Sequence, residues 1–68
     1  MHIRMGIITK VFAQIKASAR TPREIAERSG VSISNVNEVL KFLEEFGLVE
    51  TDGRRFKASG DITALPLR

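Results

Sequence analysis

The apolar residues of this 68-residue chain recur at spacings of three and four in three segments, a pattern that predicts amphipathic helices. We expect these helices over residues 5–18, 21–29 and 32–46. The stripe of the first helix comprises Ile8, Val11, Phe12 and Ile15. The small apolar face of the second comprises Ile25 and Ala26. The stripe of the third comprises Val36, Val39, Leu40, Leu43 and Phe46. Phe42 falls slightly outside that stripe and is a candidate for an interface instead. Packed together, the three stripes predict a three-helix core.

Local signals mark where the second and third helices begin and end. The segment Thr21–Glu24 has the capping-box pattern, in which the Thr hydroxyl and the Glu carboxylate each bond a free backbone N–H, and it carries Pro at the first helical position. Ser32 is the expected N-cap of the third helix. Gly30 and Gly47 can adopt the left-handed conformation that ends a helix. Two helices joined by about three residues that include glycine indicate a helix-turn-helix.

A β-hairpin is expected after the third helix, over residues 48–59. Leu48 and Val49 begin the first strand, and residues 55–59 form the return strand with Phe56 facing inward. The turn at residues 51–54 contains Asp-Gly, which favours a tight hairpin because both central positions tolerate positive φ. The predicted fold class is therefore mainly α with a small β-hairpin: a winged helix-turn-helix with a three-helix core and a two-stranded wing, in one domain over residues 1–68.

Apolar residues at both ends of the chain leave two interpretations open. A chain this short buries only ~60% of its unfolded surface, so a partner subunit would stabilise it. The upstream apolar residues complete the core or form part of a dimer surface. The tail, residues 60–68, is either disordered, as terminal segments usually are, or packs its apolar residues against this domain or a second subunit, and its apolar content favours packing. The candidate dimer surface comprises Met1, Ile3, Ile7, Ile62, Leu65 and Leu67.

The order and spacing of these signals carry a family resemblance. The pieces TPREIAER, GVS, SNVNEVLKFLEEFGLV and DGRR lie within residues 21–57. Together they resemble the winged helix-turn-helix of small prokaryotic and archaeal transcription regulators of the MarR, ArsR and IclR type. The resemblance implies DNA binding, with the third helix in the major groove and the wing on the flanking minor groove or backbone.

The charge of the chain and the chemistry of its polar side chains also fit DNA as the partner. The formal charge of +3 and the pI of about 10.0 suit a polyanion, although they are equally typical of a soluble surface. Asn35 and Asn37 have the side chain that bonds adenine N6 and N7, the alternative being a solvated helix face. Glu38 departs from the pattern, since a carboxylate repels phosphate, yet it can accept from cytosine N4. The expected DNA contacts are Thr21, Arg23, Ser32, Ser34, Asn35, Asn37, Glu38, Lys41, Arg54, Arg55 and Lys57.

The predicted function is sequence-specific binding of double-stranded DNA by a homodimeric transcriptional regulator. The alternative is a winged-helix module for protein–protein contact in a transcription or replication assembly, which Glu38, Glu44, Glu45 and the apolar tail favour. An enzyme is not expected, because the chain lacks cysteine, has a single histidine, His2, and has no glycine-rich phosphate loop. We expect no metal, no cofactor and no small-molecule effector. No apolar run approaches ~20 residues, so a cytoplasmic, nucleoid-associated protein without membrane contact is expected.

Overall fold

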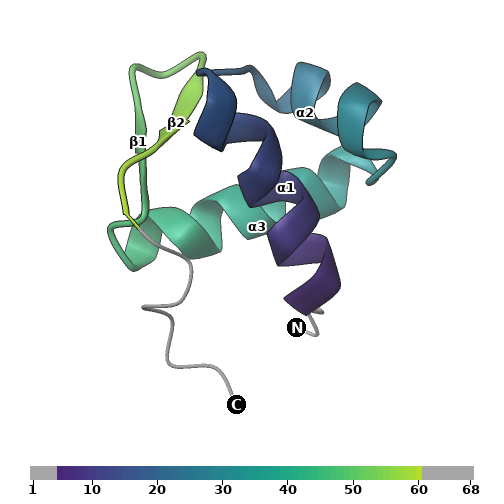
Figure 1. Cartoon of the computed structure of the whole chain (residues 1–68), viewed down its shortest axis with the longest axis horizontal. Coiled ribbons are helices and arrows are strands. Elements are labelled where there is room, and N and C mark those ends of the chain that lie inside the picture. Colours follow the sequence, from purple (N-terminus) through teal and green to yellow (C-terminus); the bar gives the residue numbers. More distant parts are fainter. Residues whose placement is uncertain (1–4, 61–68) are drawn as a thin grey trace.

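The computed structural model describes residues 5–60 and forms the predicted winged helix-turn-helix (Figure 1). Its elements are α1 (Met5–Ala17), α2 (Pro22–Ser29), α3 (Ile33–Glu45), β1 (Val49–Thr51) and β2 (Phe56–Ala58). The predicted helices are confirmed, with ends that differ by one residue. Five of the six candidate dimer residues lie outside the described part of the chain: Met1, Ile3, Ile62, Leu65 and Leu67.

The core is apolar and draws on all three helices and on the start of the hairpin. In Figure 1, α1 crosses α3, while the hairpin and α2 lie near opposite ends of α3. The buried residues that the structure describes are Ile8, Val11, Phe12, Ile15, Ile25, Val36, Val39, Leu40, Leu43, Leu48 and Val49. No polar or charged residue within 5–60 is buried. The predicted stripes of α1 and α3 are thus confirmed except at Phe46.

Phe46 was predicted to be buried, and this prediction is wrong: its side chain is 44% exposed. The reason is the way α3 ends. Gly47 takes φ 71°, its N–H donates to the Glu44 carbonyl (3.0 Å), and the Leu48 N–H donates to the Leu43 carbonyl (3.0 Å). This is a Schellman motif, which brings the residue after the glycine back against the last turn of the helix. Leu48 therefore fills the space that the helical spacing assigned to Phe46.

Phe42 and Ile7 both lie partly in the core. Each is half-buried and packs against the buried cluster. The rings of Phe42 and Phe46 lie against each other with their centroids 4.9 Å apart and tilted by 53°. Phe42 therefore lies at the edge of the stripe, as its position in the sequence predicted, whereas Phe46 lies outside the core.

The hairpin pairs Val49 with Ala58 and Thr51 with Phe56 in antiparallel register. Four residues, 52–55, join the paired ends, and only Gly53 among them has positive φ (100°). The expected turn with two central residues at positive φ is therefore not formed. A bridge that was not predicted adds a third segment to the sheet: Arg20 donates to the Phe56 carbonyl (3.0 Å) and accepts from the Phe56 N–H (2.7 Å).

Candidate nucleic-acid interface

The N-terminus of α2 is closed by the predicted capping box. The Thr21 hydroxyl accepts from the Glu24 N–H (3.2 Å), and the Glu24 carboxylate accepts from the Thr21 N–H (2.9 Å). The backbone hydrogen bond from Thr21, the Thr21 hydroxyl and the charges of Arg55 and Arg20 hold the pKa of Glu24 below its ordinary value of 4.5. A carboxylate thus already occupies one N–H at this helix end. The hydroxyl and the backbone N–H of Thr21 are both used in capping α2. The exposed side chain of Arg23, in the first turn of the helix, is a better candidate for a phosphate contact.

Arg20 ties the wing to the helices. Besides its two backbone bonds to Phe56, its Nε donates to the carbonyl of Gln14 in α1 (2.7 Å). The side chain is half-buried, so its charge lies between the end of α1 and the start of α2. Arg20 therefore links β2 to the end of α1.

The six predicted contacts at α3 are all exposed: Ser32, Ser34, Asn35, Asn37, Glu38 and Lys41. The Ser32 hydroxyl accepts from the Asn35 N–H (3.3 Å) as the predicted N-cap, and the Ser34 hydroxyl lies 3.4 Å from it. Helical geometry divides the other side chains. Residues two apart are rotated by about 160° from each other, so Asn35 and Asn37 lie on opposite flanks of the exposed face. Asn35 and Asn37 can therefore contact opposite sides of a groove, but they cannot both contact the same base.

The charge on α3 is unevenly distributed. Its first turn has no acidic residue, and over its whole length it carries one lysine and three glutamates: Lys41, Glu38, Glu44 and Glu45. Glu38, Lys41, Phe42 and Glu45 line a surface hollow of about 170 Å³. The first turn of α3 is consequently uncharged, whereas residues 38–45 carry a net negative charge and are followed by the exposed Phe46.

The turn of the wing is shaped by Asp52. Its carboxylate accepts the backbone N–H groups of Arg54 (2.9 Å) and Arg55 (3.0 Å), and these two bonds, the one from Arg55 first, hold the pKa of Asp52 below its ordinary value of 3.8. The Thr51 hydroxyl accepts from the Gly53 N–H (3.0 Å). The Asp-Gly pair therefore forms a side-chain-capped loop that presents the exposed Arg54 and Arg55 at its end.

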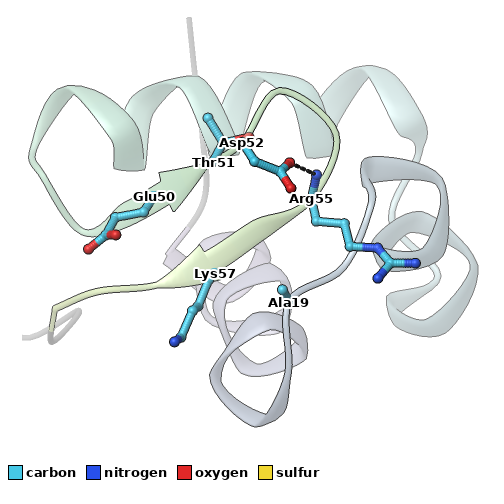
Figure 2. A pocket seen from close by; sticks show the side chains of 6 residues that line it. All are labelled: Ala19, Glu50, Thr51, Asp52, Arg55 and Lys57. Atoms are coloured by element: carbon cyan, nitrogen blue, oxygen red, sulfur yellow. Dashed lines mark hydrogen bonds between the residues drawn. The ribbon is translucent and has the colours of Figure 1, made fainter.

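Arg55 and Lys57 border a hollow of about 300 Å³ between the wing and the segment after α1. Figure 2 shows both side chains extending from one side of the hairpin, with Ala19 between them, Glu50 on the other strand and Asp52 in the turn. Glu50 faces Lys57 across the strands. Arg54, Arg55 and Lys57 thus give the wing an excess of positive charge, in the place where the sequence predicted it.

One exposed apolar side chain on α3 was not among the predicted contacts. Ile33, the first residue of the helix, is 48% exposed although it is large and apolar. A signal for it was present in the sequence, because Ile33 directly follows the N-cap and precedes the polar residues Ser34 and Asn35. Arg20 was also missed as a strand residue, since a one-residue bridge leaves no alternating pattern to detect.

Two features are absent from the described residues, 5–60. They contain no group of three or more His, Cys, Asp or Glu side chains placed to hold a metal ion. No helix among them is long and apolar enough to cross a membrane.

Comparison with known families gives one match. Residues 10–63 match the model of a family described as the sugar-specific transcriptional regulator TrmB. The match covers all of α2, α3 and the wing, so it includes every element of the interface described above. The match confirms the predicted winged-helix regulator, whereas the resemblance to the MarR, ArsR and IclR type identified the family only approximately. Curated proteins and solved structures returned no match.

Proposed function

This chain belongs to the TrmB family of transcriptional regulators, and from that premise we propose that it binds double-stranded DNA sequence-specifically as a homodimer. The family match supports a DNA-binding regulator domain. The proposal adds the base specificity, the roles of individual residues and the two-fold arrangement. It also implies a cytoplasmic protein, because promoter DNA is its target.

The observation that carries the proposal is a difference in side-chain chemistry: the first turn of α3 is polar and uncharged, whereas the wing is basic. The first turn of α3 offers exposed, uncharged polar side chains that suit base edges, and Asn35 and Asn37 have the amide that pairs with adenine. Arg54, Arg55 and Lys57 offer charge without a comparable pattern of base recognition. Guanidinium groups bond phosphate oxygens and enter narrow minor grooves. We therefore assign base recognition to α3 and backbone attachment to the wing, with Arg23 as a further phosphate contact.

The experiment is a fluorescence-anisotropy titration of a randomised duplex pool and of a duplex selected from it, each at two salt concentrations. The expected result is a steep loss of affinity with salt and a preference of ~10³ or more for the selected duplex. Salt dependence without preference would indicate a sequence-neutral binder. No binding at low salt would contradict DNA binding altogether.

The homodimer is supported by the two-fold geometry with which helix-turn-helix dimers bind DNA. Two recognition helices related by a two-fold axis contact half-sites ~10 base pairs apart or a multiple of that distance. The selected duplex is then expected to be palindromic, and sedimentation equilibrium at micromolar concentration is expected to give twice the chain mass. A monomer that selects a single, asymmetric half-site would contradict the dimer.

A second candidate function follows from the negative charge of residues 38–45 in α3. Glu38, Glu44 and Glu45 repel phosphate, and the exposed Phe46 with its neighbour Phe42 forms an apolar surface beside them. This combination suits a protein partner with a basic, apolar surface. Glu44→Lys together with Glu45→Lys separates the two functions: a gain in DNA affinity without loss of preference would favour the DNA role, because added positive charge strengthens phosphate contacts.

The family description as sugar-specific concerns its members as a group. For this chain we propose action by promoter occupancy, with no effector site assigned to residues 5–60. The hollow between the wing and Ala19 is lined mainly by charged side chains. Addition of mono- and disaccharides to the anisotropy titration is accordingly expected to leave the affinity for the selected duplex unchanged, and a shift in affinity would contradict this assignment.

A further inference from the structure

Ile33 is an apolar side chain placed among polar ones on the face that the proposed function assigns to DNA. The large apolar residues exposed within residues 5–60 are Met5, Ile33 and Phe46. Phe46 packs against Phe42 at the C-terminal end of α3, and Met5 begins α1. Ile33 differs from both because it lies in the first turn of α3, beside Ser34. An exposed apolar residue here needs a reason other than core packing.

The capping of α3 does not supply that reason. The apolar residue before the N-cap Ser32 is Val31, which is half-buried and packs against the core, as the residue before a cap does when it contacts the fourth helical residue. The fourth helical residue, Val36, is fully buried. Ile33 lies outside this contact and presents 48% of its side chain to the surface.

Helical geometry pairs Ile33 with Asn37. Residues four apart on a helix have Cβ atoms about 5–6 Å from each other and lie on the same flank. Successive bases along one strand are about 3.4 Å apart, so this pair spans one or two base steps. Asn37 has the amide that bonds adenine N6 and N7. Ile33 is branched at Cβ, which restricts its rotamers and presents its methyl groups in a fixed direction.

We propose that Ile33 is a specificity-determining residue that contacts the 5-methyl group of a thymine in the major groove. The thymine lies one or two steps from the A·T pair contacted by Asn37. Thymine is the base that carries a methyl group at the major-groove edge, and apolar side chains recognise it by contact. The inference rests on the proposed function and deepens it, because it names a base that α3 selects and the group on that base.

The test replaces each thymine of the selected duplex in turn by deoxyuridine, which removes the methyl group and keeps the base pair. At one thymine per half-site, the affinity of the unaltered protein is expected to fall about fourfold, the effect of losing one buried methyl contact. Ile33→Ala is expected to bind the thymine and deoxyuridine duplexes equally at that position. Ile33→Val, which keeps the branched Cβ, is expected to retain part of the preference.

The control is Met5→Ala, which removes a side chain of similar exposure (45%) from a helix that lies outside the interface, and it is expected to keep the full fourfold effect. Far-ultraviolet circular dichroism verifies that each variant is folded. Equal effects of deoxyuridine on the unaltered protein and on Ile33→Ala at every position would overturn the inference alone. A selected site without thymine would overturn it as well. Failure to select any site would overturn the proposed function and this inference together.

Discussion

Two carboxylates determine how the candidate contact residues are presented. Glu24 closes the start of α2 and Asp52 shapes the turn of the wing, each by accepting backbone N–H groups. Both patterns are local in sequence: a Thr three residues before a Glu, and an Asp before a Gly. The capping box was therefore predictable in full, whereas the Asp-Gly pair predicted a hairpin with the wrong turn, because the Asp52 carboxylate stabilises a longer loop.

These carboxylates make stability depend on pH in a defined direction. The pKa values of Glu24 and Asp52 are lowered on folding from ordinary values of 4.5 and 3.8. Each therefore adds stability that is present above its ordinary pKa and is lost as the pH falls through the lower, folded value. The melting temperature is expected to be nearly constant from pH 7 to about pH 5 and to fall below that.

Glu24→Gln separates the hydrogen bond from the charge, since glutamine keeps the capping geometry and does not titrate. The melting temperature of this variant, measured by circular dichroism from pH 3 to pH 7, is expected to fall less steeply with acid than that of the unaltered chain. Identical slopes for the two proteins would show that the capping carboxylate does not contribute to the acid dependence.

At the scale of elements, the end of α3 decides which apolar residues are buried. Spacing along the helix correctly predicted Val36, Val39, Leu40 and Leu43, because these lie within regular helix. It failed at Phe46, because the Schellman motif directs Leu48 into the core. Burial of Leu48 in place of Phe46 depends on two backbone hydrogen bonds. Gly47 donates to the Glu44 carbonyl, and Leu48 donates to the Leu43 carbonyl. The spacing of apolar residues does not show which residue after the end of the helix turns back into the core, although Gly47 indicated that the helix ends there.

Truncation at the end of α3 measures this difference. Leu43→Ala removes a fully buried side chain and is expected to lower the free energy of unfolding by about 2–5 kcal/mol. Phe46→Ala removes a larger side chain from a surface position and is expected to cost less than about 1 kcal/mol. Urea denaturation followed by circular dichroism gives both values. A loss from Phe46→Ala as large as that from Leu43→Ala would contradict the described packing.

The same substitution at two glycines tests the backbone. A Cβ at Gly6, in α1, meets no atom within 4 Å, so Gly6→Ala is expected to raise the free energy of unfolding by up to about 1 kcal/mol. A Cβ at Gly47 also meets no atom, but φ there is +71°, so Gly47→Ala is expected to lower it by about 1–2 kcal/mol. Changes of the same sign in urea denaturation would contradict the assigned conformation of one of the two residues.

At the scale of the whole molecule, the arrangement of charge carries the functional argument. The net charge of +3 fits a DNA-binding protein without requiring one. The fold gathers Arg54, Arg55 and Lys57 on the wing, leaves the first turn of α3 uncharged and gives residues 38–45 a net negative charge. The sequence predicted which residues belong to the interface elements. It did not show that Asn35 and Asn37 lie on opposite flanks of the exposed face or that Ile33 is exposed, because these depend on where the core meets α3.

The central claim is that α3 recognises bases while the wing holds the DNA backbone. The most direct measurement is an anisotropy titration of Asn35→Ala, Arg54→Ala and the unaltered protein on the selected duplex and on a scrambled duplex, at several salt concentrations. Asn35→Ala is expected to reduce the preference for the selected duplex by ~1–3 kcal/mol and to leave the salt slope unchanged. Arg54→Ala is expected to weaken both duplexes alike and to lower the salt slope by about 1. Equal loss of preference from the two substitutions, with the same salt slope, would contradict the account.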